Sequence, residues 1–194
     1  DNVLSYTGDG TSGVYIFGAM LEQNSVASSY IPTQGSASTR VAETATNSGN
    51  SEVFNSEQGV LFVNSATLVE GGDVKIIGLS DGSTNNRISI TYHSTENRIQ
   101  IFGSKGGVEL FNLQYLNAKK INFNKVALKY DNSLIKFYYN GFIVDSATPN
   151  YSMFNPNTLN RVNFDRIDNN NNFYGKTKEI GYYDTILTDL ELET

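Results

Sequence analysis

The chain has 194 residues, with 14 Lys+Arg against 20 Asp+Glu for a formal charge of −6, no cysteine and a single histidine. This composition excludes disulfides, thiolate metal sites, cysteine nucleophiles and multi-histidine zinc sites. It provides no basic face for general nucleic-acid binding. No apolar run approaches the roughly 20 residues of a membrane span, so we expect no membrane insertion. The first five residues have neither a basic start nor an apolar stretch, so the sequence predicts no signal peptide.

Small uncharged polar residues dominate the rest of the composition. The chain has 24 Asn, 19 Ser and 16 Thr, and only 18% of its residues are charged. Such residues favour turns and strand edges and disfavour helix interiors. The composition is therefore typical of an all-β protein with a neutral, hydrogen-bonding surface.

The first 50 residues differ from the remainder. Residues 14–21 (VYIFGAML) predict one strand, and residues 34–50 have the Ser, Thr, Ala and Gly content of a linker. One strand cannot bury its faces alone. It must therefore join the following fold, pair with another chain, or end a domain that lies upstream.

From residue 57 to residue 193 the pattern predicts nine to eleven strands separated by turn residues. The predicted strands are residues 60–63, 74–79, 87–93, 98–102, 108–114, 125–130, 134–139, 142–145, 159–167 and 175–183. Asn140-Gly141 is the preferred pair for a two-residue hairpin turn. The one good helix signal is at residues 188–191, where Thr188 can cap a turn. The fold class is all-β, a two-sheet antiparallel sandwich.

Alternation in residues 87–93 and 98–102 separates a core face from an exposed face. Isoleucines 88, 90, 99 and 101 and Tyr92 lie on the core face, which leaves polar and aromatic side chains outside. Tyr138 would join them if its strand lay in the same sheet. Sugars bind to aromatic faces and to planar amides, carboxylates and arginines. The alternative is an ordinary solvated sheet face. The predicted carbohydrate-binding residues are Arg87, Thr91, His93, Arg98, Gln100, Phe102 and Tyr138.

Several stretches resemble known proteins. Residues 17–22 (FGAMLE), 29–36 (SYIPTQGS) and 39–43 (TRVAE) are similar to a junction that recurs in phage tail and fibre proteins and related bacterial surface proteins. Residues 125–130 and 137–141 resemble the central hairpin of concanavalin A-like (laminin-G or pentraxin-like) lectin and glucanase domains. The C-terminal residues that resemble the end of such a domain are Phe173, Tyr174, Gly175, Lys176, Lys178, Glu179, Ile180, Tyr182, Tyr183, Leu187, Thr188, Asp189, Glu191 and Leu192.

The resemblance implies an organisation and a location. Residues 1–50 would be the terminal strand and linker of an upstream jelly-roll module, and residues 51–194 a concanavalin A-like jelly roll. The protein would sit on a virion, or be extracellular on a cell surface. It would contact the upstream domain of the same protein, and it could form a homo-oligomer, as phage fibre proteins commonly do.

Catalytic motifs of the enzymes with this fold do not occur in the sequence. Glucanase relatives carry Glu-x-Asp-x-x-Glu or Glu-x-Asp-x-Glu on one strand, whereas residues 165–168 (DRID) have the wrong order and length. Lyase relatives carry Arg-x-Glu-x-Arg and Gln-Ile-His or Gln-Val-His, whereas residues 100–102 (QIF) lack the basic residue. We therefore predict no catalytic residues and no enzymatic activity.

No cofactor is required by this interpretation, but a calcium ion is an expectation. Asp165 and Asp168, beside the asparagine run at residues 169–172, could supply oxygen ligands. Laminin-G-like relatives often bind calcium at the rim of the sandwich. The alternative is an ordinary polar loop.

Three functions follow, in order of preference. The first is a non-catalytic, lectin-like module that binds a glycan or polysaccharide and serves host or surface recognition in a larger phage tail, virion or bacterial surface protein. The second is a purely structural or oligomerising domain of such an assembly. The third is a polysaccharide lyase or glycoside hydrolase whose catalytic residues escape the known motifs. Because fold alone does not determine function, the site has to be argued separately.

Overall fold

The computed structural model describes residues 7–13, 15–21, 30–39, 49–94, 96–168 and 171–193. The chain divides into two compact units, Asp1–Thr44 and Ala45–Thr194. The module boundary expected after residue 50 stays a prediction.

In the first unit, the strand expected at residues 14–21 does not form over residues 15–21, and Val14 lies outside the described residues. The side chains of Tyr15, Ile16 and Phe17 are almost fully exposed. No described residue pairs with this segment, and a strand needs a neighbour for its backbone groups, so β-propensity alone was insufficient here. Residues 22–29 and 40–48, which include parts of the predicted junction and linker, also lie outside the described residues.

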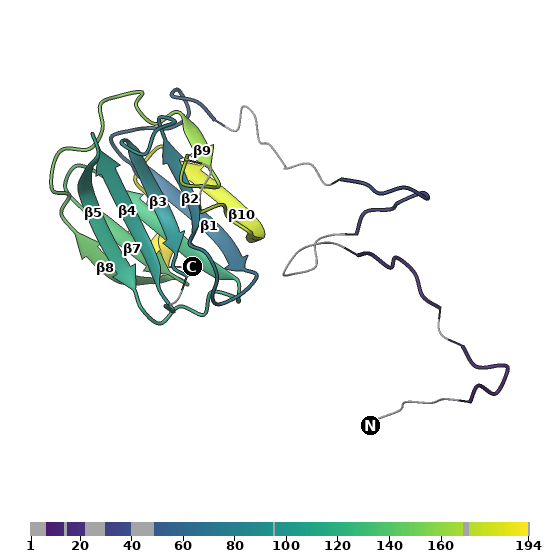
Figure 1. Cartoon of the computed structure of the whole chain (residues 1–194). Coiled ribbons are helices and arrows are strands. Elements are labelled where there is room, and N and C mark those ends of the chain that lie inside the picture. Colours follow the sequence, from purple (N-terminus) through teal and green to yellow (C-terminus); the bar gives the residue numbers. More distant parts are fainter. Residues whose placement is uncertain are drawn as a thin grey trace. The chain divides into compact units, whose positions relative to one another are not determined.

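The second unit is a sandwich of ten described strands and one short helix (Figure 1). Its elements are β1 (Gly59–Thr67), β2 (Lys75–Ser80), β3 (Arg87–Tyr92), β4 (Ile99–Lys105), β5 (Val108–Tyr115), β6 (Asn124–Tyr130), β7 (Ile135–Tyr139), β8 (Phe142–Ala147), β9 (Arg161–Asn163), β10 (Gly175–Tyr183) and α1 (Asp189–Leu192).

Two five-stranded sheets make up the sandwich, and every pairing is antiparallel. One sheet, the β1 sheet, has the order β10-β1-β6-β7-β8, and the other, the β3 sheet, has the order β5-β4-β3-β2-β9. The predicted two-sheet antiparallel sandwich is therefore confirmed.

One predicted strand is much shorter than expected. The pattern at residues 159–167 predicted nine residues of strand, and β9 has three. Leu159 instead donates its backbone N–H to Ser56 Oγ at 2.9 Å. At the other end, Asp165 Oδ1 accepts the N–H of Ile167, which adopts a φ of 79°. That turn ends the strand, because a branched side chain in the left-handed region cannot continue a ladder.

Alternating residues of both sheets fill the core as predicted. Ile88, Ile90 and Tyr92 of β3 are buried against the other sheet, as are Ile99 and Ile101 of β4. The hydroxyl of Tyr92 is hydrogen-bonded to Ser65 Oγ of β1 at 2.6 Å, so the buried polar atoms of this pair satisfy each other. Burial raises the pKa of the Tyr92 hydroxyl, which therefore stays protonated.

Glycine is required at position 78, near the middle of β2. A Cβ atom there would lie 2.3 Å from the carbonyl oxygen of Ile88 and 3.1 Å from the Cα of Ser89, both on β3. Glycine inside a strand often marks such a close approach of two backbones. The pairing of β2 with β3 depends on this missing side chain.

The C-terminal helix α1 begins as the sequence predicted. Thr188 is the N-cap, and Glu191 completes a capping box by accepting the Thr188 N–H at 2.8 Å. Leu187 and Leu192 pack on the outer face of the β1 sheet against a small cluster that includes Tyr138. The C-terminal segment thus covers part of that face.

Candidate functional site

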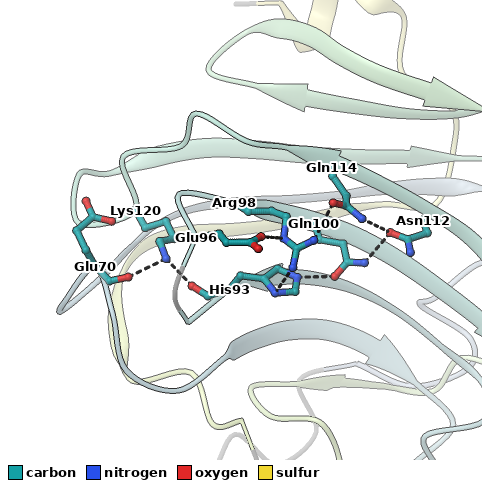
Figure 2. Close-up of polar contacts among 8 residues, drawn as sticks. All are labelled: Glu70, His93, Glu96, Arg98, Gln100, Asn112, Gln114 and Lys120. Atoms are coloured by element: carbon teal, nitrogen blue, oxygen red, sulfur yellow. Dashed lines mark hydrogen bonds and ion pairs between the residues drawn. The ribbon is translucent and has the colours of Figure 1, made fainter.

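A row of polar side chains crosses the outer face of the β3 sheet from the end of β3 to β5. The strand register places Thr91 opposite Gln100 and Gln100 opposite Gln114. It also places Phe102 opposite Asn112. Because their neighbours along each strand point into the core, these side chains point outward. We define the polar row as His93, Arg98, Gln100, Asn112 and Gln114, with Glu96 beside one end (Figure 2). Glu109 lies beside the other end.

Arg98 determines the direction of the hydrogen bonds at one end of the row. Its Nη2 lies 2.9 Å from His93 Nδ1, and its Nη1 donates to Gln114 Oε1 at 2.9 Å. A guanidinium can only donate, so His93 Nδ1 must accept and the imidazole must be neutral. The imidazole proton then lies on Nε2, which donates to Gln100 Oε1 at 2.7 Å.

The same direction continues across the sheet to a carboxylate (Figure 2 shows the row as far as Asn112). Gln100 Nε2 donates to Asn112 Oδ1 at 2.6 Å, and Gln114 Nε2 donates to the same oxygen at 3.3 Å. Asn112 Nδ2 in turn donates to Glu109 Oε2 at 3.1 Å. The row therefore runs from a group that can only donate to a group that can only accept, which fixes the orientation of every amide.

This arrangement leaves donors free on an accessible face. In the described part of the chain, the amide nitrogens of Gln100, Asn112 and Gln114 each make one hydrogen bond. An amide nitrogen carries two hydrogens, so each retains one N–H. The positive charge of Arg98 is balanced by Glu96, whose carboxylate lies 2.7 Å from Nε. The row is thus suited to a neutral ligand group that accepts hydrogen bonds, such as a sugar hydroxyl.

Of the residues predicted for this face, four lie outside the polar row in different environments. Thr91 is buried. Phe102 lies under the guanidinium of Arg87, with 5.3 Å between that group and the ring centroid. Burial and nearby Arg166 lower the pKa of Arg87. Arg87 Nε and Nη1 are buried and have no hydrogen-bond partner among the described residues.

Tyr138 was predicted to join this face, and that prediction is wrong. Its strand, β7, belongs to the β1 sheet, and the side chain is 1% exposed. The Tyr138 hydroxyl donates to Asp189 Oδ1 of α1 at 2.6 Å. Alternation placed the side chain on an outer face, but the sequence contained no information on which sheet β7 would join.

Asp189 connects α1 to the β1 sheet through three donors. Lys129 Nζ lies 3.0 Å from Oδ1, and Lys136 and Tyr138 also donate to the carboxylate. Hydrogen bonds from Lys136, Tyr138 and Lys129 hold the pKa of the Asp189 carboxyl well below its ordinary value of 3.8. The charged form is therefore the one that stabilises the docked segment.

We expect Asp189→Asn to lower Tm by about 3 °C near neutral pH, since these bonds to an exposed carboxylate contribute on the order of 1 kcal/mol. A lowered folded-state pKa stabilises the fold fully above the unfolded value of about 4, and this contribution disappears as the pH falls through the folded-state pKa. Thermal unfolding from neutral to strongly acidic pH should therefore show the two melting curves converging. Asp184→Asn removes the same charge and should change Tm little. A difference that is constant across pH would contradict the proposed role.

The predicted calcium ligands lie in the loop after β9. Asp165 Oδ1 accepts the N–H of Ile167 at 2.7 Å, and Asp168 Oδ2 lies 3.8 Å from Arg166 Nε. Across the residues that the structure describes, no group of three or more His, Cys, Asp or Glu side chains is gathered as for a metal ion. Calcium at Asp165 and Asp168 stays a prediction, and residues 169 and 170 of the same loop lie outside the described residues.

Sequence reasoning missed two of the five residues of the polar row. Asn112 and Gln114 belong to a strand that the pattern did predict, but their contribution to the site was not recognised. The signal was present, since Phe111 and Leu113 alternate with them and are buried. Only the register of β4 against β5 brings their amides beside Gln100.

Comparisons with known proteins agree with the fold. No protein-family model and no curated protein sequence matches the chain. Among solved structures, the Ruminococcus gnavus IT-sialidase CBM40 bound to α2,3-sialyllactose matches with a TM-score of 0.59 and 18% identity over 71% of this chain and 81% of that chain. The K499G mutant of NanB sialidase from Streptococcus pneumoniae matches with a TM-score of 0.60 and 17% identity over 74% of this chain and 24% of that chain. The SAP-like pentraxin of Limulus polyphemus matches with a TM-score of 0.53 and 10% identity over 73% of this chain and 70% of that chain.

At these identities the likeness is one of fold. The second unit is a β-sandwich similar to those of a CBM40 domain and a pentraxin, consistent with the predicted concanavalin A-like architecture. Among the described residues, no helix has the length and apolar character needed to cross a bilayer.

Proposed function

We propose that the sandwich is a non-catalytic carbohydrate-binding module and that the polar row holds the glycan. One observation carries the proposal: a hydrogen-bonded row of fixed direction presents three amide N–H groups on an outer sheet face. Planar amides of fixed orientation suit recognition of sugar hydroxyls, because little conformational entropy is lost on binding. Phe102 lies partly exposed on the same face, where its ring, together with the Arg87 guanidinium that lies over it, adds an apolar and planar border to the polar row.

Structural neighbours suggest the first ligands to test. The matched CBM40 structures are described as bound to α2,3- and α2,6-sialyllactose. We therefore place both trisaccharides, with lactose as the matched neutral sugar, at the head of the ligand panel. The location stays as expected from the resemblance: a virion, or extracellular on a cell surface, within a larger phage tail or bacterial surface protein that contains an upstream module.

A structural or oligomerising role is the second candidate. The edge strand β8 exposes Phe142 to 72% and Ile143 to 41%. Exposed apolar residues on an unpaired edge favour association with another chain. Light scattering after gel filtration would detect a homo-oligomer through this edge, and Phe142→Lys should then dissociate it.

The test of glycan binding is a glycan array followed by calorimetry, with calcium and with chelator. We expect reproducible binding to one glycan class, and loss of binding in chelator would support an ion at Asp165 and Asp168. Gln100→Leu keeps the size of the side chain but interrupts the row between His93 and Asn112. We expect it to weaken binding about tenfold, the effect of one lost hydrogen bond.

Gln58→Leu is the matched control, because it replaces a glutamine before β1, outside the row. Its affinity should stay within about twofold of the wild type. Equal losses in both variants would argue against the row as the binding surface. A folded wild-type chain that binds nothing on the array would instead favour the structural role.

A further inference from the structure

Lys120 is a buried lysine whose ammonium is hydrogen-bonded to the backbone of His93, a member of the polar row. It lies between β5 and β6, and the residue is 1% exposed. Its ammonium donates to the carbonyl oxygen of Glu70 at 2.7 Å and to that of His93 (Figure 2). Burial lowers the pKa of Lys120, while nearby Glu70 raises it. A buried ammonium is costly unless it is hydrogen-bonded, so these two carbonyls are what make it tolerable.

These contacts join three loops at one end of the sandwich. Glu70 belongs to the β1–β2 loop, and His93 begins the loop between β3 and β4. Ala118, two residues before Lys120, donates its N–H to the carbonyl of Asn97 at 2.9 Å. The segment 118–120 therefore holds the β3–β4 loop at both of its ends. Lys120 is itself anchored, since its carbonyl accepts the N–H of Thr67 at 2.8 Å.

The hydrogen bond from Lys120 to the His93 carbonyl constrains the position of His93. Its imidazole lies between Arg98 and Gln100, at the ordinary hydrogen-bond distances of 2.9 Å and 2.7 Å. It lies just beyond the last residue of β3, although its N–H still bonds the carbonyl of Arg98 at 3.1 Å. Because the pairing of β3 with β4 ends there, the carbonyl group of His93 is held in place by its hydrogen bond from Lys120.

We propose that Lys120 is a positioning residue of the polar row: by holding the His93 carbonyl it keeps the imidazole between Arg98 and Gln100, and so holds the Gln100 amide in the orientation in which it meets the glycan. This inference rests on the proposed function as far as ligand affinity is concerned. The effect on the imidazole is independent of any ligand.

The test compares Lys120→Met with Lys105→Met. Lys105 also holds backbone carbonyls, those of Ser152 at 3.0 Å and Met153 at 2.6 Å, but in another loop. His93 is the only histidine of the chain, so its ring nitrogens give an unambiguous NMR signal. We expect the wild type and Lys105→Met to show the Nε2-protonated tautomer, and Lys120→Met to show the averaged tautomers of a mobile ring. Glycan affinity should fall about tenfold in Lys120→Met and less than about twofold in Lys105→Met.

Chemical rescue separates positioning from general stability. The chain has no cysteine, so Lys120→Cys can be aminoethylated in denaturant at that position alone, which rebuilds a lysine-like ammonium after refolding. We expect this product to regain the His93 signal. Should Lys120→Met fail to fold, Lys120→Gln, which cannot span both carbonyls, should shift the signal in the same direction.

An unchanged tautomer in folded Lys120→Met would overturn the inference. If the wild type binds no glycan but Lys120→Met loses the tautomer signal, the positioning role of Lys120 is supported. Only the proposed glycan-binding function is then contradicted.

Discussion

Gly78→Ala should destabilise the sandwich by about 3 kcal/mol, a cost typical of a methyl group forced into a packed interior. The added Cβ would meet the backbone of β3, 2.3 Å from the carbonyl oxygen of Ile88, and a backbone cannot rotate away as a side chain can. Relief would require β2 and β3 to separate where the next residue, Leu79, is fully buried in the core. Urea denaturation followed by intrinsic tyrosine fluorescence would measure the loss.

Gly181→Ala provides a matched control in the other sheet. A Cβ there would have its nearest neighbours at 3.6 Å and 3.7 Å, on the side chains of Tyr183 and Phe62, which are ordinary contacts. We expect the variant to be neutral or slightly more stable, because alanine restricts the unfolded chain. Similar stabilities for the two variants would mean that β2 can move away from β3 at little cost.

Arg98→Met should weaken glycan binding about a hundredfold, the loss expected when charge-assisted hydrogen bonds are removed. Arg98 is the only donor-only member of the polar row, and it holds His93, Gln114 and Glu96. Without Arg98, either nitrogen of the His93 imidazole can carry the proton, and the side-chain amide of Gln114 can rotate by 180°. Titration calorimetry with the array-selected glycan would measure the effect.

Arg161→Met removes the same charge from β9 of the same sheet and serves as the control. Arg161 Nε donates to Asn160 Oδ1 at 3.0 Å, outside the row. Its affinity should remain close to that of the wild type. If both arginine variants lose affinity equally, the ligand responds to net charge and the ordered row is not the cause.

The fold was largely predictable because alternation and turn residues agree throughout the second unit. Strand β10 coincides with its predicted bounds, and the capped turn at Thr188 forms as expected. Two strand predictions failed because the local sequence pattern does not show which other segments a strand will pair with or what will end it. Residues 15–21 are apolar enough for a strand but form none, and β9 is ended by the turn at Asp165.

The sequence could predict which residues of the candidate site share a face within one hairpin, but not which residues a third strand adds. The hairpin of β3 and β4 could be read from alternation, which gave His93, Arg98 and Gln100 correctly as one face. Adding a third strand requires sheet order and register, which depend on contacts between distant residues. For this reason Tyr138 was assigned to the wrong sheet and Asn112 was missed. The buried Lys120 gave no sequence signal, because an isolated lysine usually lies at the surface.

The width of the polar row sets how large a recognised epitope could be. The row spans three adjacent strands, and strands lie about 4.8 Å apart, so its reach across the sheet is about 10 Å. That length matches a disaccharide, not a long polysaccharide segment. A contact of this size yields weak monovalent binding, so useful retention on a glycan-coated surface would come from avidity, through several copies displayed together.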